Sequence, residues 1–254
     1  MLQAYLDGAL FGASSGQGDA RVVLLHGWRR THEDFARVAV DLSSRGVAAV
    51  AIDLPGFGAT PPPEAATGAR GYAALLAPLV ERLAAASGPP VLVGHSFGGR
   101  VATCLAARYP ETVGGLVLSA VPLIRSEMPA STPSARYRLV RTAARYHLVS
   151  PRRLEAARRR HGSSDYRAAS GVVRGVLVAT VSESYEDELR ALRCGVALVW
   201  GALDTTTPPR VARAAAELVH GATLEVLDGV GHLVPTEAPE PLAAAAASLL
   251  EGSH

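Results

Sequence analysis

The chain has 254 residues, of which 48% are hydrophobic and 19% are charged. It is therefore long enough to bury a core and too apolar to be a disordered segment. A formal net charge of +2 gives no indication of nucleic acid or an anionic membrane as a partner, and no stretch resembles a signal peptide or a membrane span, so we expect a cytoplasmic protein.

Short apolar runs that end in turn residues alternate with segments of helical period along the chain. The first two, Ala4–Leu6 and Leu10–Ala13, are joined through Asp7 and Gly8 and predict an antiparallel hairpin at an edge of a sheet. The later runs predict strands over Val22–His26, Val47–Ile52, Val91–His95, Leu116–Ser119, Val196–Trp200 and Leu224–Leu227. Buried runs separated by amphipathic helices predict a mostly parallel sheet with helices on both faces, an α/β fold.

This alternation breaks over residues 122–190. The stretch carries several prolines, a predicted helix over Ala135–Leu148, a second helix with Ser150 as its N-cap, and an apolar segment over Val172–Val181. We expect a helical lid over residues 122–190, inserted before the strand Val196–Trp200, and an α/β core formed by residues 1–121 and 191–254. The alternative is that these are ordinary helices packed on the sheet.

The motif Gly94-His95-Ser96-Phe97-Gly98-Gly99 follows one predicted strand and precedes an amphipathic helix. A serine in this context predicts a nucleophile on a sharp strand-to-helix turn, where small residues two positions to either side let the chain bend. The helix N-terminus that follows favours developing negative charge. A purely structural turn is the alternative, because the pattern also arises by chance.

A serine hydroxyl needs a neighbouring base, and the chain has eight histidines. His232 is the predicted base, because it follows the last strand-like run, stands downstream of Ser96 and is flanked by flexible glycine-containing sequence. The alternative for a loop histidine of this kind is a solvated side chain. The other histidines occur in the predicted lid, at helix ends, at the C-terminus or beside motif glycines, and fit that role less well.

The base in turn needs a carboxylate to orient it. Asp204 follows the strand Val196–Trp200 and is the predicted acid, with a plain helix N-cap as its alternative. The end of the preceding strand, at Ser119, offers no acidic residue.

The order Ser96, Asp204, His232 resembles that of the α/β-hydrolase superfamily. Further segments resemble the same family across nearly the whole chain: Leu24-Leu25-His26-Gly27-Trp28, Asp53-Leu54-Pro55-Gly56-Phe57-Gly58, and the run from His232 through Pro235 and Glu237 to Pro239-Glu240. The chain is thus identified as similar to lid-bearing serine hydrolases of the α/β-hydrolase fold, esterases among them.

This resemblance implies an oxyanion hole made by the backbone N–H groups of Trp28 and Phe97. The Trp28 ring is expected either to form a wall of the substrate pocket or to pack in the core. We expect His26 and Asp53 to hold loops rather than to act in catalysis. No nucleotide-binding, phosphate-binding or metal-ligand motif is present, so neither a cofactor nor a metal is expected.

These residues predict hydrolysis of a small carboxylic ester through an acyl-enzyme on Ser96. One alternative is a carbon–carbon bond hydrolase, a lyase or a haloperoxidase-like enzyme of the same fold, and an anionic substrate would call for arginines in the pocket. Arg100, Arg138 and Arg141 are the candidates, although the arginines of the lid also fit a solvated helix face. A small-molecule receptor on a hydrolase scaffold and a biosynthetic cyclase or acyltransferase remain further alternatives. The physiological substrate and the oligomeric state do not follow from the sequence.

Overall fold

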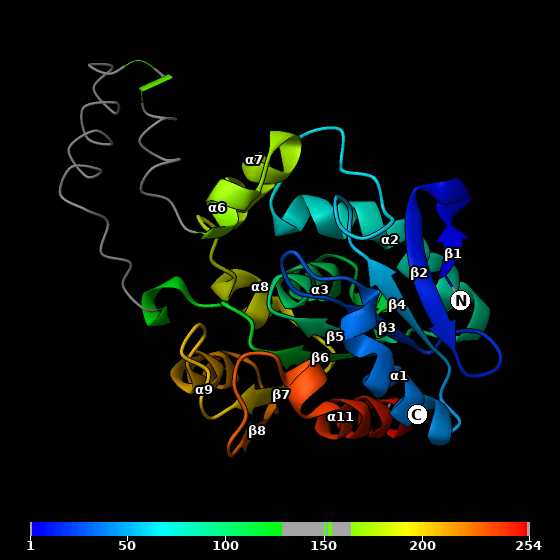
Figure 1. Cartoon of the computed structure of the whole chain (residues 1–254). Helices are drawn as coiled ribbons and strands as arrows, with labels where there is room; N and C mark the ends of the chain where they lie inside the picture. The colour runs from blue at the N-terminus through cyan, green and yellow to red at the C-terminus, as the bar shows by residue number, and fades with distance from the viewer. Residues whose placement is uncertain (1, 129–149, 151, 154–163, 253–254) are drawn as a thin grey trace.

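The strands of the structure form one eight-stranded sheet in the order β1-β2-β4-β3-β5-β6-β7-β8 (Figure 1). The structure is a computed structural model that describes residues 2–128, 150, 152–153 and 164–252. The strands are β1 Leu2–Tyr5, β2 Leu10–Ser15, β3 Val22–Leu25, β4 Ala49–Asp53, β5 Val91–His95, β6 Gly115–Ser119, β7 Gly195–Gly201 and β8 Thr223–Leu227. Only the pairs β1–β2 and β2–β4 are antiparallel. The mostly parallel sheet predicted from the sequence is therefore confirmed.

The predicted hairpin forms the antiparallel edge of the sheet, with β1 and β2 as its strands. Its connection is longer than the expected dipeptide. A short 3-10 turn over Leu6–Gly8 takes left-handed backbone at all three residues, which glycine adopts freely and aspartate tolerates.

Helices cover both faces of the sheet (Figure 1). Helices α1 (Ala36–Ser44) and α11 (Pro239–Glu251) pack together on one face, and α2 (Ala69–Ser87), α3 (Phe97–Arg108), α8 (Glu186–Ala191) and α9 (Pro209–Leu218) cover the other. Shorter segments are η2 (His32–Phe35), η3 (Pro110–Thr112), η4 (Arg125–Glu127), α6 (Ser164–Ala168), α7 (Gly171–Thr180) and α10 (Val234–Glu237).

Two apolar cores result, one on each side of the sheet. On β5, Val91 and Val93 belong to the core beneath α1 and α11, whereas Leu92 belongs to the core beneath α2 and α3. Every residue of this strand is buried, because helices cover both of its faces. The central strand that leads to Ser96 is therefore held rigidly from both sides.

The described part of residues 122–190 contains helices and 3-10 turns but no strand. The apolar segment predicted over Val172–Val181 forms α7, at the top of Figure 1. The amide of Arg153 lies 3.4 Å from the Ser150 hydroxyl, as an N-cap at Ser150 requires. The helix predicted over Ala135–Leu148 lies outside the described residues, and the assignment of residues 122–190 as a lid stays a prediction.

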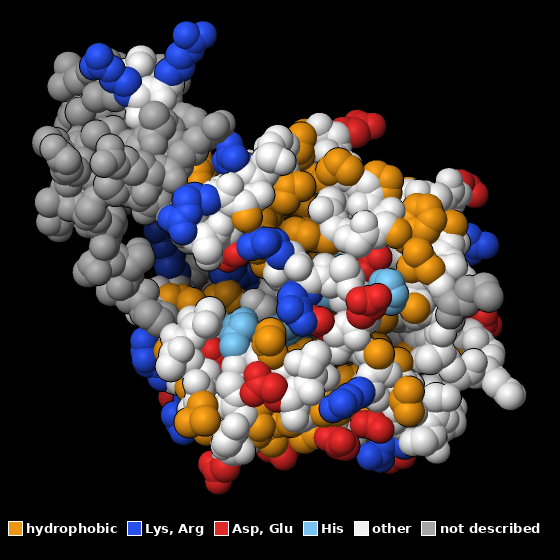
Figure 2. Space-filling view, in the orientation of Figure 1, with side chains coloured by type: hydrophobic (Ala, Val, Ile, Leu, Met, Phe, Trp, Pro, Cys, Tyr) orange, Lys and Arg blue, Asp and Glu red, His pale blue; other side chains and the backbone are white. Residues whose placement is uncertain are grey.

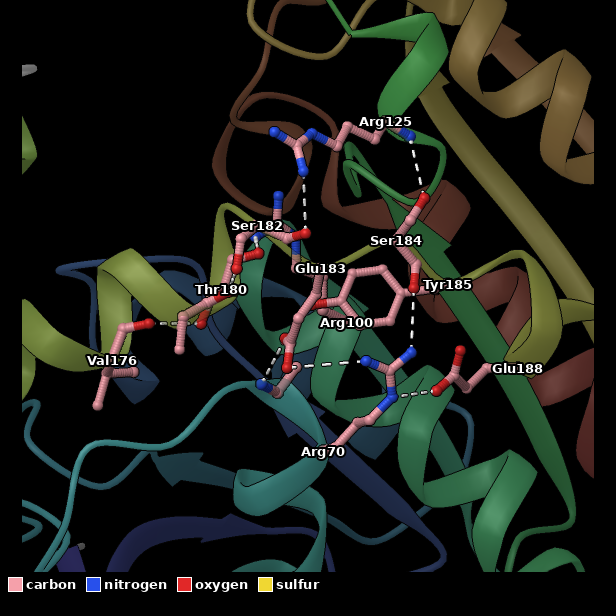
Figure 3. Close-up of polar contacts among 12 residues, drawn as sticks. Arg70, Arg100, Arg125, Val176, Thr180, Ser182, Glu183, Ser184, Tyr185 and Glu188 are labelled. Carbon is pink, nitrogen blue, oxygen red and sulfur yellow. Dashed lines mark hydrogen bonds and ion pairs between the residues drawn. The ribbon is translucent and has the colours of Figure 1, made fainter. Parts of the chain in front are cut away.

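A strap of residues 180–185 leads from the end of α7 to the start of α8 and is held by arginines (Figure 3). Alternate carbonyls of the strap accept hydrogen bonds from three different elements: Thr180 from Arg100 of α3 (3.1 Å), Ser182 from Arg125 of η4 (3.1 Å), and Ser184 from Arg70 of α2 (3.1 Å). Arg100 also lies over the ring of Tyr185. These contacts tie α7 to α3, the helix that begins next to Ser96.

Glu183 of the strap caps the N-terminus of α2. Its Oε2 accepts hydrogen bonds from the Ala69 amide (3.0 Å) and from the Tyr185 hydroxyl (2.7 Å). The helix has no capping side chain of its own, because Gly68 occupies the N-cap position. A Cβ on Gly68 would lie 1.9 Å from the Glu183 carboxylate, so the glycine makes room for this cap.

Replacing Glu183 with alanine is expected to lower the free energy of unfolding by about 1–3 kcal/mol, because a helix cap is lost and the buried Tyr185 hydroxyl loses its acceptor. Denaturant titration measures the change. Asp187→Ala is the matched control: its carboxylate lies in the adjoining helix but is 98% exposed, and its loss is expected to leave stability nearly unchanged. Equal stability of the two variants would contradict the capping role.

Candidate active site

Ser96 occupies a strained turn between β5 and α3. Its backbone angles are φ 49° and ψ −109°, a conformation that costs a residue other than glycine about 1–3 kcal/mol. Two hydrogen bonds pin the turn to neighbouring strand ends: the Ser96 amide donates to Ser119 (2.9 Å), and the Gly98 amide donates to His26 (3.0 Å). The serine is therefore held at the carboxyl ends of β3, β5 and β6.

The glycines on either side of Ser96 are required by close backbone contacts. A Cβ on Gly94 would lie 2.4 Å from the Cα of Gly99. A Cβ on Gly98 would lie 2.1 Å from the carbonyl oxygen of Leu25. Both distances are far below van der Waals contact, so the strand and the helix approach each other as closely as the motif suggested.

Asp204 and His232 meet beyond the ends of β7 and β8. The Asp204 Oδ2 lies 2.8 Å from the His232 Nδ1. The other carboxylate oxygen accepts hydrogen bonds from the amides of Thr206 and Thr207, at 2.8 Å each. The buried carboxylate is thus held in one orientation, which fixes the Nδ1–H tautomer of His232 and leaves its Nε2 free to act as a base.

Glu237 of α10 holds the backbone on both sides of His232. Its carboxylate accepts hydrogen bonds from the Gly231 amide (2.6 Å) and the Leu233 amide (3.1 Å). Glu237 lies in the segment that resembles the family, but its hydrogen bonds to two backbone amides are not apparent from the sequence. The loop that carries the histidine is consequently less free than its glycines suggested.

The structure also brings His232 against the residue that precedes Ser96. The rings of His95 and His232 are 5.1 Å apart between centroids. On the other side of the turn, Gly27 lies so close that a Cβ placed on it would be 3.5 Å from the Cβ of Ser96. The three sequence-predicted catalytic residues therefore gather at one end of the sheet, together with the loop that follows β3.

The predicted oxyanion donors border the same turn. In the part of the chain that the structure describes, neither the Trp28 amide nor the Phe97 amide has a hydrogen-bond acceptor. The Trp28 ring packs edge-on against Phe57 (5.0 Å between centroids) and Phe97 (5.3 Å). These contacts give the ring a packing role, and its place in a pocket wall stays a prediction.

His26 holds the loop after β3, as its expected structural role requires. Its Nε2 accepts a hydrogen bond from the Leu54 amide (2.9 Å), so its Nδ1 carries the proton and donates to the Gly27 carbonyl (2.8 Å). Burial lowers the pKa of His26, which keeps the ring neutral and preserves both bonds.

Asp53 holds two loops together at the end of β4. It accepts hydrogen bonds from the amides of His32 (2.7 Å) and Ala59 (2.9 Å) and also contacts the His32 ring (2.9 Å). Burial alone would raise the pKa of Asp53, but these hydrogen bonds outweigh it and hold the pKa below its usual value. Asp53 therefore acts as the loop anchor that the sequence suggested.

Replacing Asp53 with asparagine is expected to lower the free energy of unfolding by about 2–3 kcal/mol at pH 7, because buried charge-assisted hydrogen bonds are lost. A lowered native pKa means that the ionised group stabilises the fold above the unfolded pKa of about 3.9. This contribution is lost as the pH falls through the native value. Denaturant titrations at pH 7 and pH 3 should therefore show that the difference in unfolding free energy between the original protein and Asp53→Asn is smaller at pH 3. An equal difference at the two pH values would contradict the prediction.

Two arginines line a cavity of about 360 Å³ between the loops that follow β3 and β4 and the start of α7. Arg29, Arg30 and Phe57 line one side of the cavity, and the start of α7 lines the other. Figure 2 shows arginine side chains gathered over the region where α6 and α7 lie. However, Arg29 is paired with Asp165 (3.5 Å), and Arg30 binds Asp34 through two nitrogens (2.6 Å each). Both cations at the cavity are therefore already paired with carboxylates.

The sequence-predicted pocket arginines receive no support from these contacts. Arg100 donates to Thr180 and faces Tyr185 in the strap (Figure 3), so its place in a substrate pocket stays a prediction. Arg138 and Arg141 lie outside the described residues. Among the described residues, no group of three or more histidine, cysteine or acidic side chains is arranged to hold a metal ion. In the same part of the chain, no helix is long and apolar enough to cross a membrane.

Comparison with known proteins matches this chain to a family over most of its length. The profile described as "Alpha/beta hydrolase family" matches residues 22–245. The pimeloyl-[acyl-carrier protein] methyl ester esterase of Edwardsiella ictaluri is 30% identical over 96% of this chain and 98% of its own. A thermophilic esterase from Thermogutta terrifontis superposes with a TM-score of 0.70 at 25% identity, covering 98% of this chain and 96% of the other. The bromoperoxidase of Bacillus anthracis superposes with a TM-score of 0.72 over 95% of each chain, but at 17% identity it shows the fold alone.

Proposed function

This chain belongs to the alpha/beta hydrolase family, and from that membership we propose that it cleaves a small carboxylic ester through an acyl-enzyme on Ser96. Its similarity to an esterase along nearly the whole chain indicates an ester-cleaving enzyme of this fold. The serine mechanism is supported by the hydrogen bond of 2.8 Å between Asp204 and His232, beside a serine on a strained strand-to-helix turn.

In the proposed mechanism, Asp204 orients His232, which removes the hydroxyl proton as the Ser96 oxygen attacks the ester carbon. The amides of Trp28 and Phe97 bind the oxyanion, and each such donor contributes about 3–4 kcal/mol to the barrier reduction. His232 then passes its proton to the departing alcohol. A water molecule, deprotonated by the same base, attacks the acyl-enzyme and releases the acid and the free serine.

The relatives suggest a more specific substrate. Because the esterase that matches this chain end to end is named for a methyl ester of a carrier-bound acyl chain, we propose a methyl ester of a medium-length acyl chain. No contact among the described residues favours the carbon–carbon hydrolase, lyase, haloperoxidase or receptor alternatives.

Labelling with a fluorophosphonate tests the nucleophile. We expect one covalent adduct, located by peptide mass spectrometry on Ser96, and competition by methyl esters of six- to eight-carbon acids. Hydrolysis of these methyl esters and of p-nitrophenyl butyrate tests the reaction itself. No adduct and no turnover would refute the proposal, whereas labelling without turnover of any ester would favour a receptor.

A further inference from the structure

His95 is a buried titratable residue that the proposed mechanism does not use. It is the last residue of β5 and only 1% exposed. Its Cδ2 would lie 3.0 Å from a Cβ placed on Gly27, so the ring packs closely against the loop that follows β3. The backbone of His95 pairs in register with Ser119 of β6, which holds the residue at the end of the sheet. The ring is therefore buried and closely packed at this end of the sheet.

Hydrogen bonds restrain the ring and the backbone of His232, but they leave the ring free to tilt. Asp204 fixes one ring nitrogen, and Glu237 fixes the backbone on either side of the residue. A single hydrogen bond still allows the ring to tilt about the line that joins its nitrogen to the carboxylate. The contact that opposes this tilt is the His95 ring, at 5.1 Å between centroids and 58° between the ring planes.

We propose that His95 is a positioning residue for the reaction: its buried ring is the surface that sets the tilt of the His232 ring and so aims Nε2 toward Ser96. This inference rests on the function proposed above. A base must lie within hydrogen-bond reach of the hydroxyl that it deprotonates, and a misplacement of about 1 Å is enough to cost a hundredfold in rate.

The charge state of His95 suits this positioning role. Burial, together with the nearby His232, lowers the pKa of His95 to about 3. Arg30 and His26, the other charged or titratable groups that act on it, lower the pKa further. The His95 ring is therefore neutral near pH 7, and it does not repel the imidazolium that the proposed mechanism forms on His232.

The test compares His95→Ala, which removes the surface, with His95→Phe, which keeps a flat ring of similar size. We expect His95→Ala to lower kcat by about 10- to 100-fold with KM nearly unchanged, and to slow fluorophosphonate labelling of Ser96 in parallel. His95→Phe should retain kcat within a few-fold of the original protein and an unshifted pH profile, because the proposed role requires shape and neutrality but no proton.

Loss of stability must be separated from loss of positioning. Val93→Ala is the matched control, because Val93 is equally buried on the same strand but belongs to the apolar core beneath α1 and α11. It should lower the melting temperature without lowering kcat at temperatures well below that midpoint. The inference is overturned if His95→Ala keeps the original kcat, if His95→Phe is as impaired as His95→Ala, or if Val93→Ala loses kcat equally. Failure of the proposed function is a different result, namely an unmodified protein that neither labels nor turns over.

Discussion

Replacing Ser96 with alanine is expected to lower kcat for ester hydrolysis by about 10⁴- to 10⁶-fold, because the proposed reaction loses its nucleophile. The residual rate is expected to come from substrate binding and from the predicted oxyanion donors, the amides of Trp28 and Phe97. Steady-state kinetics with p-nitrophenyl butyrate measures the loss. The fold should be retained, since alanine removes only a hydroxyl and the strained turn is held by backbone hydrogen bonds.

A double variant tests the serine mechanism more sharply, because the losses in kcat from two residues that act together do not add. If Ser96 and His232 act as one unit, the double variant Ser96→Ala/His232→Ala should be no slower than Ser96→Ala alone. Ser248→Ala, on α11 and remote from the site, is the control for activity lost during expression and purification of a variant. Retention of more than about a hundredth of the original kcat in Ser96→Ala would refute the serine mechanism.

Replacing Gly98 with alanine is expected to lower the free energy of unfolding by more than about 3 kcal/mol, or to prevent folding altogether. The added methyl group would lie 2.1 Å from the Leu25 carbonyl oxygen and 2.7 Å from that of His26. Both are backbone atoms of β3 and its loop, so no side-chain rotation relieves the clash. Denaturant titration or the yield of folded protein measures the effect.

Gly195→Ala is the matched control for this substitution. A Cβ on Gly195 would meet only the end of the Leu249 side chain, at 2.8 Å, and that flexible chain is able to move aside. We expect a change smaller than about 1 kcal/mol. If both variants were equally stable, the close approach of β3 to α3 would not be the reason for the glycine.

Much of the architecture was predictable from local sequence. The runs over Val91–His95 and Val196–Trp200 became β5 and β7 with little change at their ends, because buried parallel strands read as continuous apolar segments. Asp53 and His26 were predicted as loop anchors, since each stands at a strand end in a motif of turn residues. The hairpin was also predicted, although its turn is longer than Asp7 and Gly8 alone indicated.

Contacts between side chains from distant parts of the chain were not predictable. The ring contact between His95 and His232 joins residues 137 positions apart, and nothing in either local sequence signals it. Arg100 illustrates the same limit. Its guanidinium binds a carbonyl of the strap, a partner that only the tertiary arrangement of α3 and α7 reveals, while its predicted place in a substrate pocket stays a prediction.

The order of the strands places the predicted nucleophile and the predicted base after strands that differ in burial. Ser96 follows a central strand whose residues are all buried, whereas His232 follows β8, an edge strand whose residues are partly or fully exposed. Edge elements with few buried contacts open locally at a smaller free energy than central ones do. We therefore expect the loop that carries His232 to open locally at a smaller free energy than the turn that carries Ser96.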